Sequence, residues 1–113
     1  MKSYIIANKK LPAVGSKIYI SGAISNVSKY VSDAKFGAAE QWCIERGYIP
    51  INPNNMPCNL SHWEEFMKRD IKLLVDCDVI LMLDNWKISR GARLEYDIAT
   101  RLGMEVLEVI NCK

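Results

Sequence analysis

The segment Val79–Gly103, VILMLDNWKISRGARLEYDIATRLG, contains the features that decide the fold. It begins with an unbroken apolar run, short enough for a strand that is buried on both faces. A polar loop follows, and Ser89 is placed to cap a helix that ends near Gly103, a residue type common just after a helix. The segment therefore predicts a strand, a loop and a helix. In an open α/β sheet, ligands bind where such strands end.

Glu95 departs from the pattern of this helix. The charged, solvent-facing stripe consists of Arg90, Arg93, Asp97 and Arg101. Glu95 instead falls on the core-facing stripe, with Gly91, Ala92, Ile98, Ala99 and Leu102. A carboxylate in that position has to be paired, solvated through a cleft or protonated. Two interpretations stay open: a glutamate at the edge of the stripe that reaches water, or a catalytic carboxylate that lines a pocket.

Composition indicates an ordinary globular protein. The chain has 113 residues, enough for one domain and one core, and half of them are apolar. The net charge of +2 is mild and the basic residues are dispersed, so neither nucleic acid nor a membrane is an expected partner. Residues 1–10 lack the apolar stretch of a secretory signal, and no segment has transmembrane length.

The cysteines indicate a reducing compartment. None of the four forms a C-x-x-C pair, and a core of this size needs no disulfide, so we expect reduced thiols and a cytoplasmic protein. Cys58 and His62 have no second pair of ligands beside them, so we expect no metal site.

The order of elements predicts an α/β fold. Strands are expected at 17–21, 48–51, 79–83 and 105–110, and helices at 28–46, from Ser61, and at 90–102. Ser61, with Glu64 three residues later, has the pattern of a capping box. Pro50 cannot donate to a ladder, which predicts an edge strand. We expect a flavodoxin-like or Rossmann-like doubly wound parallel sheet, strand order 2-1-3-4, with helices on both faces. Residues 17–113 form this single domain, and residues 1–16 an N-terminal arm or a short edge strand.

Several chemistries lack their motifs in this chain. There is no G-x-G-x-x-G, no Walker lysine and no G-x-S-x-G, so we expect no cofactor and no serine hydrolase triad. Two carboxylates remain, because Asp70 also interrupts an apolar helical stripe. Asp70 is either a structural group bonded to backbone or arginine, or a member of a catalytic pair. Paired carboxylates suit glycosyl chemistry.

Three stretches carry a family resemblance. KIYISGAI (17–24), HWEEFMKRDIKLLVDCDVILML (62–83) and NWKISRGARLEYDIATRLG (85–103) resemble the nucleoside 2-deoxyribosyltransferase superfamily. Within it, the chain is most similar to a small bacterial and phage branch without assigned activity, and then to the 2′-deoxynucleoside 5′-phosphate N-hydrolases. The likeness covers residues 17–110, and its most specific part is the spacing Ser89-Gly91-Glu95.

The resemblance implies roles for particular residues. Glu95 matches the nucleophile that attacks C1′ of the sugar, and Asp70 matches an aspartate that assists proton transfer to and from the base. Tyr19 matches a tyrosine that contacts substrate or positions the nucleophile, although a core tyrosine is the alternative. Candidates for contacts with substrate are Gly22, Ile24, Asn52, Asp84, Trp86, Ser89 and Gly91.

Ser89 favours a nucleotide over a nucleoside. A neutral hydroxyl at a helix N-terminus suits an anion, whereas the aspartate that the transferases tend to carry there would repel a phosphate. The turn Ala23–Asn26 has no arginine, although the hydrolases carry one, so Lys29, Lys87 or Arg90 would have to substitute.

The expected function is cleavage or transfer of the N-glycosidic bond of a deoxynucleoside or its 5′-monophosphate. The alternatives are a non-catalytic module that binds a nucleotide or a nucleotide-derived signal, and a protein-interaction scaffold. The resemblance further implies a homodimer or a higher homo-oligomer.

Overall fold

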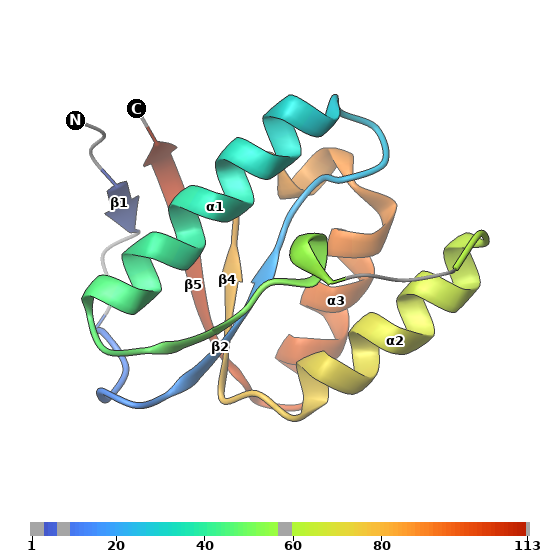
Figure 1. Ribbon diagram of the computed structural model, residues 1–113. Coiled ribbons are helices and arrows are strands. Elements are labelled where there is room, and N and C mark those ends of the chain that lie inside the picture. Colours follow the sequence, from blue (N-terminus) through green and yellow to red (C-terminus); the bar gives the residue numbers. More distant parts are fainter. Residues whose placement is uncertain (1–3, 7–9, 57–59, 113) are drawn as a thin grey trace.

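The computed structural model describes residues 4–6, 10–56 and 60–112. The strands of this part are β1 (Tyr4–Ile6), β2 (Lys17–Ser21), β3 (Ile49–Ile51), β4 (Val79–Met82) and β5 (Glu105–Cys112). Its helices are α1 (Lys29–Glu45), α2 (Trp63–Val75) and α3 (Arg90–Arg101), with short 3₁₀ turns η1 (Pro53–Asn55) and η2 (Trp86–Ile88). Figure 1 shows the strands as one sheet with helices on both of its faces.

The parallel part of the sheet confirms the predicted strand order. The strands lie in the order β1-β5-β4-β2-β3, and β2 to β5 pair in parallel. Ignoring β1, this is the predicted order 2-1-3-4 in a doubly wound α/β fold. The all-apolar strand β4 lies inside the sheet and every one of its residues is buried. The strand that carries Pro50 lies at an edge, as its missing N–H requires.

The N-terminal segment contributes a strand to the other edge. β1 pairs antiparallel with β5, with Tyr4 opposite Cys112. Of the two alternatives that the sequence left open for residues 1–16, the described part therefore contains the short edge strand. Residues 1–3 and 7–9 lie outside the described residues.

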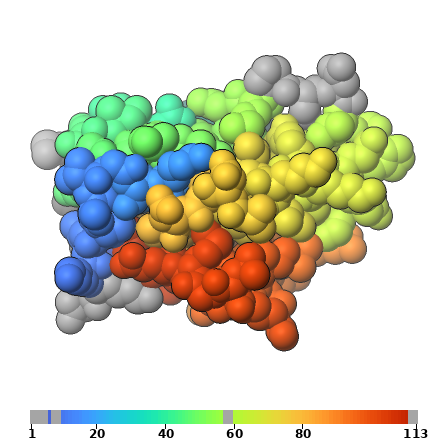
Figure 2. Space-filling view, turned by 90° about the horizontal axis from the view of Figure 1, so that it is seen from below, coloured from blue at the N-terminus to red at the C-terminus, as the bar shows by residue number. Residues whose placement is uncertain are grey.

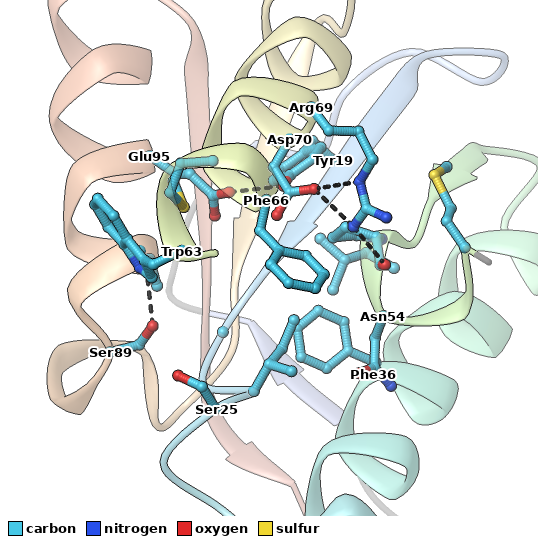
Figure 3. A pocket seen from close by; sticks show the side chains of 18 of the residues that line it. Tyr19, Ser25, Phe36, Asn54, Trp63, Phe66, Arg69, Asp70, Ser89 and Glu95 are labelled. Carbon is cyan, nitrogen blue, oxygen red and sulfur yellow. Dashed lines mark hydrogen bonds and ion pairs between the residues drawn. The ribbon is translucent and has the colours of Figure 1, made fainter. Parts of the chain in front are cut away.

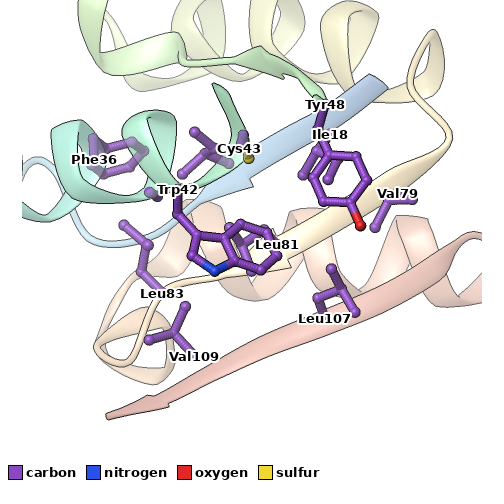
Figure 4. Close-up of a cluster of buried hydrophobic side chains, with 12 residues drawn as sticks. Ile18, Phe36, Trp42, Cys43, Tyr48, Val79, Leu81, Leu83, Leu107 and Val109 are labelled. Carbon is purple, nitrogen blue, oxygen red and sulfur yellow. The ribbon is translucent and has the colours of Figure 1, made fainter. Parts of the chain in front are cut away.

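Alternation along the strands divides the core between two faces of the sheet. Ile18 and Ile20 of β2 pack with α1, in the cluster shown in Figure 4 that includes Trp42 and Leu81. Tyr19 points to the opposite face, which α2 and α3 cover. Ser21, two residues after Tyr19 in β2, therefore faces the same two helices.

The helix ends follow local capping, with one correction. Ser89 Oγ accepts a hydrogen bond from Ala92 N at 3.1 Å and so begins α3, while Gly103 follows the helix with φ of 73°. The predicted cap of α2 at Ser61 is wrong by one residue, because His62 is the N-cap. Glu65, rather than Glu64, turns back and accepts from the backbone N–H of His62 at 3.1 Å.

The two ends of the sheet differ in what closes them. Figure 2 looks onto the end where the parallel strands begin, with the segment before β2, the α2–β4 turn and the α3–β5 turn side by side. There, Lys17 Nζ pairs with Asp76 at 2.7 Å. The other end, where the strands finish, carries the pocket. None of the helices in the described ranges has the length and apolar character that a membrane span requires.

Candidate functional site

A pocket of about 450 Å³ lies at the carboxyl end of β2. Side chains from both sides of the sheet plane reach it: Phe36 from α1, Asp70 from α2 and Glu95 from α3. Of the ten site residues predicted from sequence, the pocket is lined by Tyr19, Gly22, Ile24, Asp70, Ser89, Gly91 and Glu95. Figure 3 shows how several of these side chains converge. The position of the pocket agrees with the general rule for ligands in α/β sheets.

Glu95 is buried at this pocket. The buried row of α3 consists of Ala92, Glu95 and Ala99, and only 5% of Glu95 is exposed. Its carboxyl group accepts hydrogen bonds from Tyr19 Oη to Oε2 at 2.7 Å and from Ser21 Oγ to Oε1 at 2.6 Å. Glu95 is therefore not a glutamate that reaches bulk water at the edge of the stripe, but an oriented carboxyl group in a cavity.

The pKa of Glu95 is raised from 4.5 to about 7. Burial is the main cause, because it disfavours the charged form, and the negative charge of Asp70 adds to it. The hydrogen bonds from Ser21 and Tyr19 act in the opposite direction. A carboxyl group with this pKa changes charge near neutral pH, which is the range in which general acids, bases and nucleophiles operate.

The two donors to Glu95 come from one strand. Tyr19 and Ser21 are two residues apart in β2, so both face α3. Burial and the charge of Glu95 raise the pKa of Tyr19 well above 10, which keeps its hydroxyl protonated as a donor. Ser21 was not predicted as a site residue. The signal that could have found it is its alternation with Tyr19.

Asp70 is paired with its neighbour Arg69. The Nε and Nη2 atoms of Arg69 both lie 2.9 Å from Asp70 Oδ1, and Nη2 also donates to the Pro53 carbonyl oxygen at 3.2 Å. Burial raises the pKa of Asp70, and the guanidinium of Arg69 opposes that rise. Helical periodicity predicts that Arg69 faces solvent with the other charged residues of α2, and this prediction is wrong. Its side chain turns along α2 toward the pocket, because a buried carboxylate needs a cation.

Arg69 retains one unsatisfied donor. Its Nη1 atom is buried and has no hydrogen-bond partner in the described part of the chain. Such groups are uncommon in folded proteins, and water or a ligand often accounts for them. Among the described residues, the charged side chains that line the pocket are those of Arg69, Asp70 and Glu95.

Asn52, predicted to contact substrate, lies outside the pocket lining. Its Nδ2 donates to Glu40 Oε1 at 2.9 Å, and its Oδ1 accepts from Asn54 N at 3.0 Å. These bonds fasten η1 to α1, and η1 supplies the Pro53 carbonyl that holds Arg69. Asn52 therefore supports the pocket indirectly, by fixing the position of η1.

Asp84 and Trp86 also lie outside the lining. The carboxylate of Asp84 pairs with Lys35 Nζ at 3.0 Å, between the loop and α1. The Trp86 ring stacks on Tyr96 with centroids 4.7 Å apart, and its Nε1 donates to Glu108 at 3.0 Å. The indole of Trp86 therefore packs against α3 and β5, and Tyr96 already covers one face of its ring.

Two glycines at the pocket permit close packing. A Cβ atom at Gly22 would lie 2.7 Å from Leu83 Cδ1. A Cβ atom at Gly91 would lie 3.0 Å from Met67 Sδ and 3.8 Å from Trp63 Nε1. The backbone of Gly91 therefore lets α2 approach the beginning of α3.

Aromatic side chains form much of the remaining wall. Phe36, Trp63 and Phe66 line the pocket, and the sequence did not single them out as site residues. Arg90, named as a possible phosphate ligand, instead places its guanidinium carbon 3.6 Å from the centre of the Trp63 ring.

The described residues contain no group of three histidine, cysteine, aspartate or glutamate side chains arranged to hold a metal ion. Cys58 lies outside the described residues, and His62 pairs with Glu65. Cys43 and Cys77 are buried free thiols, and burial raises their pKa values to about 12 and about 11. Neither is a thiolate at neutral pH.

Comparison with protein families identifies a match to most of the chain. Residues 16–108 match the family described as Domain of unknown function (DUF4406). The chain belongs to this family. No curated protein matches it. The matched residues include β2 with Tyr19 and α3 with Glu95, so the DUF4406 domain contains the whole Glu95 hydrogen-bond arrangement.

Proposed function

We propose that this DUF4406 domain cleaves or transfers the N-glycosidic bond of a deoxynucleoside or its 5′-monophosphate. The observation that carries the proposal is the buried, doubly hydrogen-bonded carboxyl group of Glu95 in a pocket that also contains Asp70. The resemblance of three sequence stretches to the nucleoside 2-deoxyribosyltransferase superfamily supports it, because Glu95, Asp70 and Tyr19 all match functional positions there.

Glu95 acts as the nucleophile in this proposal. An oxygen of its carboxylate forms a bond to C1′, and the electrons of the C1′–N bond leave with the base. The hydrogen bonds from the two hydroxyl groups fix the direction of the carboxyl group. Each carboxylate oxygen still has a lone pair available for the attack, beyond the one that accepts the hydrogen bond. Water or a second base then attacks C1′ and releases Glu95.

Asp70 handles the proton of the base. A leaving base must gain a proton and an incoming base must lose one, and a carboxyl group with a raised pKa can serve both steps. Burial raises the pKa of Asp70 in this direction. Arg69 limits the rise, so that Asp70 can return to the ionised state after each transfer.

The pocket suits a ligand of this size and character. Its volume of about 450 Å³ falls in the range of small-molecule sites, roughly 300–1,000 Å³. Its aromatic lining suits a planar base. Ser89 and the beginning of α3 offer a neutral, N–H-rich end for a 5′-phosphate, which favours the nucleotide over the nucleoside.

A second candidate function is a non-catalytic module that binds a nucleotide or a nucleotide-derived signal. One observation favours it: with a pKa of about 7, Glu95 is only about half ionised at neutral pH, whereas a nucleophile must be ionised. In that case the same pocket would hold the ligand and return it intact.

The decisive experiment is a base-release assay. The protein is incubated with each of the four 2′-deoxynucleosides and their 5′-monophosphates, with and without a second base, and free base and new nucleoside are quantified by liquid chromatography and mass spectrometry. Release by the wild type that Glu95→Gln abolishes, and that Glu105→Gln on the exposed start of β5 leaves unchanged, supports the enzyme. Bound nucleotide recovered intact supports the second candidate.

A further inference from the structure

Arg90 and Trp63 form an interaction at the pocket that the proposed chemistry does not use. Trp63 is the first residue of α2 and Arg90 the first of α3. The guanidinium carbon lies 3.6 Å from the centre of the indole ring, which places the cation directly over a ring face. Trp63 lines the cavity, whereas Arg90 does not.

This geometry fixes the indole on one side. Arg90 covers one face, so the ring edge and the other face are what remain for the cavity. A planar guanidinium both stacks on an aromatic ring and attracts its π-system, which a point charge does less well. Beside the indole, the absence of a Cβ atom at Gly91 lets the side chain of Met67 approach the backbone of α3.

The neighbouring side chains suit a flat, apolar ligand group. Phe66 lies one turn after Trp63 on α2 and also lines the cavity, as does Met67. Figure 3 shows Trp63 and Phe66 beside the carboxyl groups of Glu95 and Asp70. A ligand whose sugar meets the carboxyl groups would therefore bring an attached planar ring against aromatic side chains.

We propose that Trp63, held by Arg90, is the platform on which the heterocyclic base of the ligand stacks. Arg90 is then a positioning residue that acts through Trp63, and not a ligand of the phosphate. The inference rests on the proposed function for the class of ligand, a deoxynucleotide, and it adds the residues that recognise the base.

The expected signature is a loss of affinity without a loss of chemistry. Removal of the guanidinium leaves the indole free to turn, so binding of a base should weaken about five- to tenfold, the effect of one cation–π contact. KM should rise by this factor while kcat is unchanged, because Arg90 does not contact the reacting atoms. Arg90→Lys keeps the charge but not the planar stack, and should fall between wild type and Arg90→Ala.

The test measures binding where no turnover can occur. In a Glu95→Gln background, isothermal titration calorimetry compares two probes: the four 2′-deoxynucleoside 5′-monophosphates, and 2-deoxyribose 5-phosphate, which has no base. We expect Arg90→Ala to weaken the nucleotides and to leave the sugar phosphate unchanged. Arg101→Ala removes the same charge from the exposed end of α3 and should change neither. Trp63→Leu, checked for folding by circular dichroism, should reproduce the Arg90→Ala pattern more strongly.

Each other outcome overturns the inference. Equal weakening of both probes would show that Arg90 attracts the phosphate. Unchanged binding in Arg90→Ala would remove its role, and failure of all nucleotides to bind would remove the platform. The proposed function fails separately: nucleotide binding that depends on Arg90, with no base released by the wild type, would keep the platform and exclude the enzyme.

Discussion

Replacement of Glu95 by glutamine should stabilise the protein at alkaline pH and not at acidic pH. The pKa of Glu95 is 4.5 in an ordinary setting and about 7 in the fold. Below the lower value the group is protonated in both the folded and the unfolded state. As pH rises from 4.5 to about 7, the unfolded state ionises first, so the stability that the protonated group contributes is progressively lost.

The structure sets the size of this loss. The difference between the two pKa values corresponds to about 3 kcal/mol, at about 1.4 kcal/mol for each factor of ten in acid dissociation. Glutamine is neutral at every pH and escapes the loss, while its amide can still exchange hydrogen bonds with the hydroxyl groups of Tyr19 and Ser21. At about pH 8 the free energy of unfolding of the variant should therefore be about 3 kcal/mol higher than that of wild type. This difference corresponds to an increase in Tm on the order of 10 °C for a domain of this size.

The assay is urea unfolding followed by circular dichroism across this pH range. The difference in unfolding free energy between Glu95→Gln and wild type should be near zero at about pH 4 and grow to a plateau above about pH 7. Glu105→Gln, an exposed control, should follow wild type throughout. A Glu95→Gln protein that is less stable than wild type at about pH 8 would refute the reasoning, because the carboxylate would then be held by bonds stronger than its desolvation.

Further measurements test the proposed chemistry, the Arg69–Asp70 pair and the implied assembly. Base release by Glu95→Gln should be slower than by wild type by about three powers of ten or more. Wild-type kcat/KM should rise with pH to a plateau above about 7, since only the ionised carboxylate attacks. A kcat/KM that falls with rising pH across this range would contradict a Glu95 nucleophile. Arg69→Met should destabilise the fold by about 3 kcal/mol and raise the pKa of Asp70, read from carboxyl chemical shifts during titration, and an unchanged pKa would show that Arg69 does not hold Asp70 ionised. The implied homodimer should appear in light scattering at tens of micromolar, and a monomer at that concentration would contradict it.

The fold was largely predictable because its strongest signals are local. Four buried apolar residues in β4 require an inner position, Pro50 requires an edge, and Ser89 and Gly103 bracket α3 through bonds within a few residues. The start of α2 was missed by one residue, since Ser61 with Glu64 matches the usual capping pattern, whereas the observed N-cap is His62, a residue type that this pattern does not include. Residues 1–16 could not be decided, because β1 is ordered by pairing with β5, which is distant in sequence.

The site was predictable where a residue contradicted its own helix. Asp70 and Glu95 were identified as carboxylates on apolar stripes, and both line the pocket. Arg69 was missed because helical periodicity assigns it to solvent, and its long side chain crosses from one stripe to the next to reach Asp70. The direction of Asp84 and Trp86 depends on contacts with α1 and β5, which no local pattern specifies.

The charged side chains of the pocket affect one another's ionisation. Arg69 favours the ionised form of Asp70, and the negative charge of Asp70 in turn disfavours ionisation of Glu95. With a pKa of about 7, Glu95 is about half protonated at neutral pH, and its carboxyl group accepts hydrogen bonds from the hydroxyl groups of Tyr19 and Ser21. The proposed nucleophile attacks only in its ionised form, so the proton must leave Glu95 before C1′ is attacked. In the proposed mechanism the Glu95 proton passes to Asp70 and from there to the leaving base, and the positive charge that develops on the sugar favours the ionised form of Glu95. In this proposed mechanism Glu95 is therefore about half protonated at neutral pH before the substrate binds, and it becomes ionised as the reaction approaches the transition state.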